Sequence, residues 1–231
     1  MTTPNVAQSH APRVLILVTS ADKFSDGRPT GAWLEEFATP YNALVRGGAK
    51  VTVVSPKGGQ APVDPHSKGT TEQDEQWKDA SLALRNTVAL SPAIHAADYD
   101  AIFIPGGHGP LFDLAVDPNV AHLISEFART GKPVASVCHG PAALLGVTLA
   151  DGKPFVSGKK LTAFSDAEEK AAGLDAEVPL SVQQKLISLG GEYSQGKNFA
   201  AYTVEDGTLI TGQNPASSEG VAKLLLKQLQ K

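Results

Sequence analysis

Short apolar runs alternate along this chain with longer stretches in which apolar residues recur at helical spacing. Six runs have the length and apolar character of buried strands: 13–19, 50–56, 101–105, 134–137, 160–164 and 209–212. Helices are predicted at 34–45, 72–78, 116–130, 178–189 and 221–229, and after the capping-box sequence at 165–168. This alternation predicts a parallel sheet with right-handed crossovers. We therefore expect an α/β protein, a three-layer α/β/α sandwich with a flavodoxin-like, mostly parallel sheet that binds ligands at the carboxyl edge of its strands.

The chain shows no internal linker, so we expect one domain over 13–231, preceded by a disordered polar leader at 1–12. Periodicity is weak from 57 to 90, where Gly58, Gly59 and Pro62 mark loops. Long segments of this kind are often functional, and we expect this one to cover part of the site.

Composition narrows the classes of partner. The chain has 231 residues, of which 42% are hydrophobic, with a net charge of −4 and a pI near 5.9. Because Lys and Arg do not cluster, we expect neither nucleic acid nor an anionic membrane surface as a partner. No apolar run reaches the ~20 residues that span a bilayer. The single cysteine rules out an intramolecular disulfide and suits a reducing compartment, so we expect a cytoplasmic protein.

The stretch 132–145 carries the strongest chemical signal. It reads as a buried strand, a sharp turn at Cys138 and a helix with Pro141 at its first position. At such an elbow, the unpaired N–H groups and the dipole of the helix are expected to lower the pKa of Cys138 below about 8.5. The alternative is an inert buried cysteine, since free cysteine packs as a small hydrophobe. The position on the elbow and the adjacent His139 favour a reactive thiol.

All six histidines lie at or before position 139. An α/β-hydrolase needs a histidine after its nucleophile, as does the glutamine-amidotransferase arrangement, so neither triad fits. The base is therefore His139 itself or a histidine from earlier in the chain.

The glycine-rich sequence 106–109 follows a predicted core strand and matches neither the Rossmann nor the Walker spacing. It is either a tight turn or a loop whose N–H groups approach a substrate oxygen, with the amide after the nucleophile completing an oxyanion hole. The chain lacks paired cysteines and His-x-x-x-His spacing, so we expect no metal and no cofactor. His108 is expected to form loop hydrogen bonds with Asp113.

Several acidic residues have no role that the pattern alone can assign. Glu35 and Glu36 both fall off the apolar stripe of their predicted helix, so periodicity makes each a solvated residue and cannot choose between them. Glu168 has a structural role in the capping box, whereas Glu169 has none assigned.

Two motifs together, ASVCHGP at 135–141 and IPGGHG at 104–109, resemble the ThiJ/PfpI superfamily. The segments 30–40, 64–67 and 209–217 are similar to the branch that contains glutathione-independent glyoxalase III enzymes and heat-shock chaperones. The resemblance implies a cofactor-independent conversion of methylglyoxal, a 2-oxoaldehyde, to lactate through a cysteine hemithioacetal, in a protein that is commonly dimeric. A cysteine peptidase or amidase is the rival enzyme, and a holdase chaperone or a redox-stress protein using the same cysteine is the other alternative.

The resemblance also implies roles for individual residues. Cys138 is the nucleophile, His139 is its partner, and Glu36 is a buried glutamate that touches the sulfur. Backbone N–H groups of Gly107 and His139 hold the oxyanion, within a loop that includes Gly106 and His108.

The acid that orients His139 is implied to be Glu169. Asp166 and Glu168 stay open as alternatives, because both lie within three residues of it and related branches use aspartate.

Overall fold

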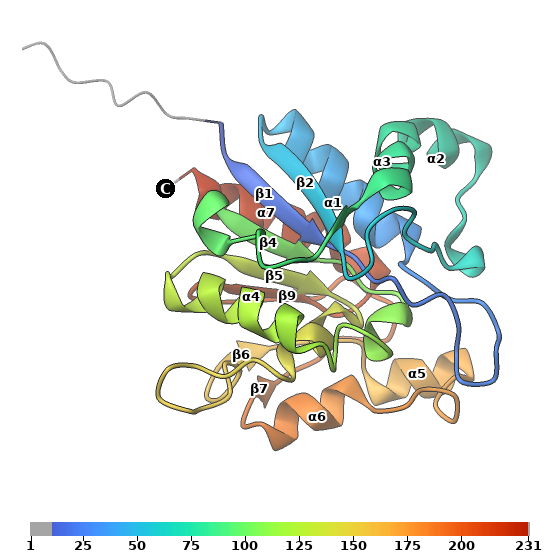
Figure 1. The fold of residues 1–231 in the computed structure, drawn as a ribbon. Helices are drawn as coiled ribbons and strands as arrows, with labels where there is room; N and C mark the ends of the chain where they lie inside the picture. The colour runs from blue at the N-terminus through green and yellow to red at the C-terminus, as the bar shows by residue number, and fades with distance from the viewer. Residues whose placement is uncertain (1–10, 231) are drawn as a thin grey trace, which may run out of the picture.

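The computed structural model describes residues 11–230. Most of the predicted leader therefore lies outside the described residues. In this part of the chain a central sheet runs through the molecule with helices on both faces (Figure 1). The three-layer α/β/α sandwich predicted from the alternating pattern is confirmed.

The main sheet of the described chain has seven strands in the order β3-β2-β1-β4-β5-β9-β8. Its bounds are β1 Arg13–Leu17, β2 Lys50–Ser55, β3 Val88–Ala89, β4 Ala101–Ile104, β5 Val134–Val137, β8 Thr203–Asp206 and β9 Leu209–Gly212. Every neighbouring pair is parallel except β8 with β9, which is antiparallel. The parallel strands therefore end at one edge, on the right of Figure 1.

The helices divide between the two faces. Their bounds are α1 Leu34–Arg46, α2 Thr71–Gln76, α3 Lys78–Ala83, α4 Pro118–Arg129, α5 Asp166–Ala172, α6 Val182–Ser188 and α7 Ser218–Leu229. α1 and α7 pack together on one face, and α4 packs on β4 and β5 from the other. Within residues 11–230, every helix is too short or too polar to cross a membrane.

Alternation along β1 divides the core in two. Val14 and Ile16 pack with Phe37 of α1 on one face, whereas Leu15 and Leu17 pack toward Phe127 of α4 on the other. Both faces are apolar because both are covered by helices. The near-continuous apolar run at 13–19 is the sequence signature of this double burial.

Several predicted elements are shorter than expected. The predicted strand 160–164 is reduced to β6, Lys160–Leu161, which pairs with β7, Glu192–Tyr193, in a separate small sheet. The predicted helix 178–189 begins only at Val182, because Ser181 caps it. α4 begins at Pro118, capped by Asp117, and leaves Val116 72% exposed. The short strands β3, β7 and β8 were not predicted, since strands of two to four residues carry little periodicity.

Candidate active site

Cys138 lies on a sharp turn directly after β5, as the elbow motif predicts. Its φ of 59° places a non-glycine residue in the left-handed region. The backbone is held on both sides, because Cys138 N–H donates to Gly212 O at 2.9 Å and Phe164 N–H donates to Cys138 O at 2.9 Å. Such strain costs about 1–3 kcal/mol and persists where the surroundings hold it in place. The turn points a buried thiol at the carboxyl edge of the sheet.

The helix predicted after the elbow is instead a 3₁₀ helix of five residues, Gly140–Leu144. Its first residue is a glycine, because a Cβ at position 140 would lie 2.3 Å from Ile104 O. A 3₁₀ helix this short provides less aligned dipole than the α-helix that the sequence predicted. The physical basis of the predicted thiolate stabilisation is therefore weaker than expected.

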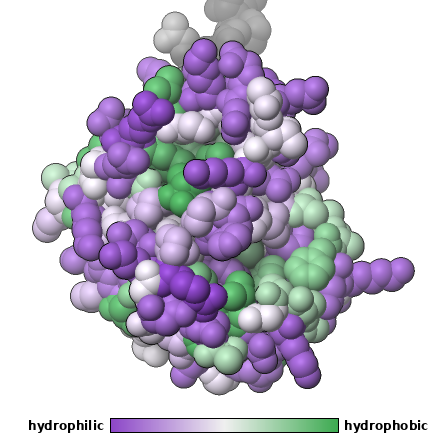
Figure 2. Space-filling model, turned by 90° about the vertical axis from the view of Figure 1, so that its right-hand side faces the viewer, coloured by the Kyte–Doolittle hydropathy of each residue, from purple (hydrophilic) through white to green (hydrophobic). Residues whose placement is uncertain are grey.

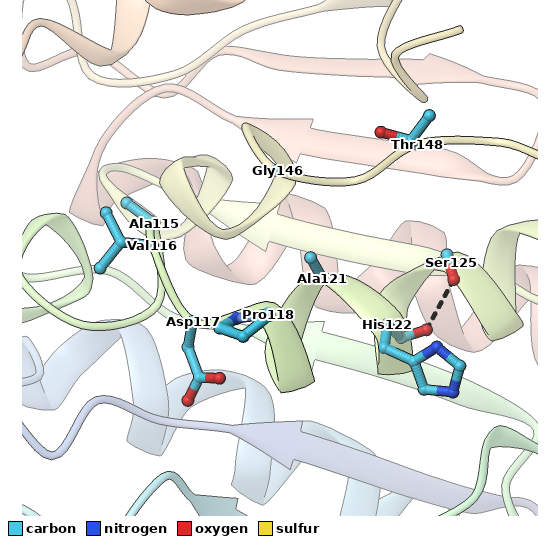
Figure 3. A pocket seen from close by; sticks show the side chains of 9 residues that line it. All are labelled: Ala115, Val116, Asp117, Pro118, Ala121, His122, Ser125, Gly146 and Thr148. Carbon is cyan, nitrogen blue, oxygen red and sulfur yellow. Dashed lines mark hydrogen bonds between the residues drawn. The ribbon is translucent and has the colours of Figure 1, made fainter. Parts of the chain in front are cut away.

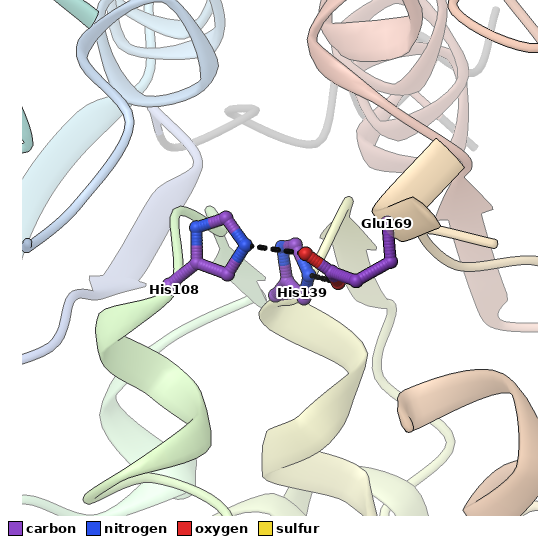
Figure 4. A group of neighbouring side chains, drawn as sticks. All are labelled: His108, His139 and Glu169. Carbon is purple, nitrogen blue, oxygen red and sulfur yellow. Dashed lines mark hydrogen bonds and ion pairs between the residues drawn. The ribbon is translucent and has the colours of Figure 1, made fainter. Parts of the chain in front are cut away.

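His139 connects the thiol to a carboxylate. Its Nδ1 lies 3.3 Å from Cys138 Sγ, and its Nε2 lies 2.6 Å from Glu169 Oε2. The second oxygen of Glu169, Oε1, lies 2.7 Å from His108 Nε2, so one carboxylate joins two imidazoles (Figure 4). The rings of His108 and His139 are 4.2 Å apart between centroids. Cys138, His139 and Glu169 thus have the geometry of a nucleophile, a base and an orienting acid.

The protonation states follow from what a carboxylate can accept. An ionised Glu169 only accepts hydrogen bonds, so a neutral His139 carries its proton on Nε2 and leaves Nδ1 as an acceptor. Burial opposes ionisation of Glu169, but His139 and His108 outweigh it and lower its pKa to about 2. Burial, with the neighbouring His108, lowers the pKa of His139 and keeps it neutral. A basic nitrogen therefore faces the Cys138 thiol at neutral pH.

Glu36 is fully buried beside the same thiol, as the motif resemblance implied and contrary to the helical periodicity, which made it a solvated residue. Its Oε2 accepts a hydrogen bond from Gly106 N–H at 2.7 Å, and its Oε1 has no hydrogen-bond partner among the described residues. A Cβ at position 106 would lie 2.7 Å from Glu36 Oε2, so glycine makes room for the carboxyl group. Burial raises the pKa of Glu36 to about 8.

The expected low pKa of Cys138 is wrong in direction. Burial, together with the charge of Glu36, raises the pKa of the Cys138 thiol well above its usual range. A protonated Glu36 removes that charge, and its pKa near 8 keeps the proton in place over much of the neutral range. The site therefore holds a neutral thiol next to a neutral imidazole base, and ionisation is coupled to attack on a substrate.

Each residue of the glycine-rich loop after β4 has a different contact in the site. Gly106 N–H is bound to Glu36, and the His108 ring is bound to Glu169, not to Asp113 as predicted. Asp113 instead accepts hydrogen bonds from Thr19 and from backbone N–H groups at 20 and 21. The Gly107 amide is close enough to the sulfur to affect the pKa of Cys138. Gly107 has φ 83° and lies against Gly31 O, where a Cβ would approach to 2.3 Å.

The two rival acids have other partners. Asp166 accepts hydrogen bonds from Ser181 Oγ and from Gln184 Nε2, both outside the site. Glu168 forms the capping box with Ser165 and also accepts from Phe199 N–H at 2.7 Å and Asn214 Nδ2 at 2.8 Å. Only Glu169 among the three contacts His139.

Figure 4 also shows a group that could hold a metal ion. The ligand atoms of His108, His139 and Glu169 all lie within 4.8 Å of one another. The motif resemblance pairs His139 with Glu169, but no sequence pattern places His108 beside them, because the three residues lie on separate segments of the chain. A cation here would have to replace both imidazole–carboxylate hydrogen bonds.

A cavity of about 430 Å³ opens above Cys138, with mostly apolar walls. Figure 2 looks at this end of the molecule, where apolar surface lies in recesses among hydrophilic side chains. From the predicted covering segment 57–90, Asp64 and His66 reach the cavity. Asp64 fixes this segment to the start of α1, since it accepts from Thr30 Oγ1 at 2.9 Å. Elsewhere in the segment, α3 packs on α1.

A second hollow of about 460 Å³ lies at the start of α4 (Figure 3). Its Asp117 caps α4, and its Ser125 hydroxyl donates to the backbone oxygen of His122 at 2.7 Å. No side chain that lines this hollow pairs a nucleophile with a base. The chemistry therefore belongs to the cavity above Cys138.

Sequence reasoning missed the outer walls of that cavity. Phe24, Arg28, Trp33 and Phe199 line it, and all four lie on loops. No motif or periodicity marks these positions. Their shared feature, large side chains within loops that flank the strand ends, becomes visible only once the fold is known.

Comparison with known proteins agrees with the fold and the site. The chain matches the DJ-1/PfpI family over residues 13–228. It is 32% identical to the glutathione-independent glyoxalase HSP31 of Saccharomyces cerevisiae, over 91% of this chain and 94% of that protein.

Two solved structures are similar over nearly the whole chain. Glyoxalase III of Candida albicans has a TM-score of 0.85 at 28% identity, over 94% of this chain and 96% of that one. The Rapid Encystment Protein of Francisella tularensis has a TM-score of 0.88 at 30% identity, over 94% and 99%. An α/β sandwich with a cysteine elbow and a neighbouring histidine thus defines the class of protein. The chain belongs to the DJ-1/PfpI family, which confirms the resemblance seen in its motifs.

Proposed function

We propose that this protein is a glutathione-independent glyoxalase that converts methylglyoxal and water to lactate. The observation that carries the proposal is a buried thiol flanked by a neutral imidazole and by a buried carboxyl group with a free oxygen. The similarity to glyoxalases of two yeasts supports the same reaction. The reaction is an internal redox step, so it requires no external oxidant or reductant.

The first step forms a hemithioacetal. The Cys138 sulfur attacks the aldehyde carbon, and His139 Nδ1, 3.3 Å from the sulfur, accepts the thiol proton. The aldehyde π bond breaks and its oxygen takes up the negative charge. Glu169, 2.6 Å from Nε2, stabilises the imidazolium that forms.

Backbone N–H groups of Gly107 and His139 hold the developing oxyanion. The Gly107 amide already lies beside the sulfur, and the His139 amide directly follows the nucleophile. In the proposal, Gly106 and His108 do not bind the oxyanion themselves. The Gly106 N–H is hydrogen-bonded to Glu36 and the His108 ring to Glu169, so both residues hold the loop in place.

The second step moves a proton between the two carbons. The protonated Glu36 first gives its proton to the hemithioacetal oxyanion and becomes ionised. Glu36 then removes the proton from the hemithioacetal carbon while the His139 imidazolium protonates the ketone oxygen, which gives an enediol. Glu36 returns its proton to the neighbouring carbon, and the hydroxyl on the sulfur-bearing carbon loses its proton to His139. The product is a thioester of lactate, which water hydrolyses to free Cys138. A pKa of about 8 suits Glu36 to both giving and taking a proton near neutral pH. His139 is the alternative base for this step.

The test is an assay of purified protein with methylglyoxal and without glutathione, following loss of the dicarbonyl and formation of lactate. Wild type is expected to be active. Cys138→Ala and Glu36→Gln should each lose at least about a hundredfold in kcat, whereas the neighbouring Glu35→Gln keeps wild-type activity. Undiminished turnover by Cys138→Ala, or faster cleavage of a fluorogenic peptide by wild type, would contradict the proposal.

We further propose that residues 13–231 act as one domain, as a homodimer, in the cytoplasm and in the response to carbonyl stress. The family resemblance and the single cysteine support this setting. One chain has a mass of 24.1 kDa, and analytical ultracentrifugation is expected to give twice that value. A species at the monomer mass would contradict the dimer.

A further inference from the structure

The cavity above Cys138 is larger than methylglyoxal requires. It measures about 430 Å³, within the range of about 300–1,000 Å³ typical of sites for drug-sized ligands. Methylglyoxal carries a single methyl group beyond its two carbonyl groups and would leave most of that space unfilled. The shape of the site therefore indicates a substrate with a larger substituent.

Aromatic rings form a continuous wall around the reacting atoms. Phe164 lies 4.6 Å from the ring of His139 and 6.3 Å from the ring of Phe199. On the other side, Phe24 lies 5.2 Å from the ring of His108. Because these rings already contact one another, a substrate ring would lie against this aromatic wall and not between its members.

Phe199 is held in the wall by the backbone. Its φ is 59°, a conformation that a bulky residue rarely adopts, and half of its side chain is exposed. Its N–H donates to the buried Glu168 Oε1, which also accepts from Asn214 Nδ2, while Asn214 donates to Ala200 O at 2.8 Å. This network keeps an exposed aromatic ring at the edge of the cavity.

The charge at the rim does not favour an anionic substrate. Arg28 is the one permanent cation among the described residues that line the cavity. It pairs with Asp26 and, at 2.8 Å, with Glu177. His66 lies against Asp64 at 3.0 Å. The rim therefore provides no unpaired permanent cation for an anionic substituent, and the mostly apolar walls favour an apolar one.

We propose that the protein acts on 2-oxoaldehydes with an aryl substituent in preference to methylglyoxal, and that Phe199 determines this preference. The inference rests on the proposed glyoxalase function and uses the same steps. With phenylglyoxal, the aldehyde carbon is oxidised to the carboxylate, the ketone carbon is reduced to the alcohol, and water supplies the added oxygen. The product is mandelate.

The test compares kcat/KM for phenylglyoxal and methylglyoxal in wild type and in Phe199→Asn. Asn tolerates the left-handed backbone and removes the ring. Wild type is expected to favour phenylglyoxal about tenfold, and Phe199→Asn to lose about tenfold on phenylglyoxal but less than twofold on methylglyoxal. Val116→Asn, an exposed apolar residue outside the cavity, is the matched control and should change neither value.

A second measurement uses wild type alone, in case Phe199→Asn folds poorly. Mandelate should inhibit competitively at a concentration about tenfold lower than lactate. Equal inhibition, or a kcat/KM for methylglyoxal equal to or above that for phenylglyoxal, would overturn this inference and leave the glyoxalase proposal standing. If neither aldehyde is turned over, both proposals fail.

Discussion

At the scale of single residues, two carboxyl groups beside Cys138 and His139 have opposite protonation states. Glu169 faces two imidazoles and stays ionised, with a pKa of about 2. Glu36 is buried with one backbone donor, and its pKa rises to about 8. Both are glutamates in the first turn of a helix, so the difference comes from their partners and not from residue type. In the proposed mechanism, Glu169 orients the base and Glu36 exchanges a proton.

Replacing Glu36 by Gln is expected to lower the pKa of the Cys138 thiol. Burial would persist, but the charge that opposes ionisation of the sulfur would be gone. The rate of alkylation by iodoacetamide, measured against pH, should show a midpoint lower than that of wild type by roughly one unit or more. Glu35→Gln serves as the control and should keep the wild-type midpoint. Coincident profiles for wild type and Glu36→Gln would rule out this effect of Glu36.

Glu169→Gln is expected to reduce kcat by about 10²–10⁴-fold while the fold survives. The new amide group can donate to His139 Nε2, which moves the imidazole proton to Nδ1 and removes the base that faces the thiol. Steady-state kinetics on methylglyoxal, with circular dichroism as the check on folding, would measure this loss. Asp166→Asn, one turn away on α5, should retain activity within about threefold because its partners lie outside the site. If Asp166→Asn were the inactive variant, the acid would be misassigned.

At the scale of elements, the site depends on two loops that leave the sheet and on the first turn of α5. The elbow after β5 presents Cys138, the glycine-rich loop after β4 presents Gly107 and His108, and the first turn of α5 presents Glu169. The capping box of α5 sets the last of these, since Ser165 N–H and Oγ both bind Glu168 Oε2. A local helix cap therefore positions a residue of the triad.

Ser165→Ala is expected to destabilise the protein by about 1–2 kcal/mol and to lower kcat together with stability. The substitution removes the cap of α5 and one donor to the buried Glu168, so Glu169 loses its fixed position. Urea unfolding and steady-state kinetics measure the two effects. Asp117→Ala, which removes the cap of α4 away from the site, should cost about 1 kcal/mol and leave kcat unchanged. If Ser165→Ala and Asp117→Ala have equal kcat, the cap of α5 does not position Glu169.

At the scale of the whole molecule, burying Glu36 costs stability that depends on pH. Its pKa in the folded state, about 8, exceeds the usual value near 4.5, so the folded protein binds more protons than the unfolded chain between these values. Stability therefore falls as pH rises through this window. Glu169 has the opposite sign, because its low pKa stabilises the fold above pH 4.5 and this contribution is lost as pH falls toward 2.

The free energy of unfolding of Glu36→Gln minus that of wild type should accordingly increase as pH rises. The difference is expected to grow by roughly 1 kcal/mol per pH unit between about pH 5 and about pH 8. Urea unfolding at three pH values across this window would measure it, with Glu35→Gln as the control that shows no such growth. A difference independent of pH would contradict the raised pKa of Glu36.

Much of the fold follows from local pattern. The strands β1, β2, β4, β5 and β9 were predicted because each is a continuous apolar run, and the helices α1, α4 and α7 because their apolar residues recur at helical spacing. The elements that were missed or misplaced, β3, β7, β8 and the start of α6, are short and depend on partners distant in sequence. Their formation is decided by pairing and capping, not by periodicity.

The sequence by itself determined the elbow, its cysteine and the order of strands and helices, because these depend on neighbours along the chain. The tertiary structure decided the rest of the chemistry. The motif resemblance implied a buried Glu36, but only packing shows that Gly106 binds its carboxyl group, that His108 shares Glu169 with His139, and that the pKa of Cys138 is raised and not lowered. The physical reason is that ionisation responds to burial and to charges within a few ångströms, and those neighbours come from segments far apart in sequence.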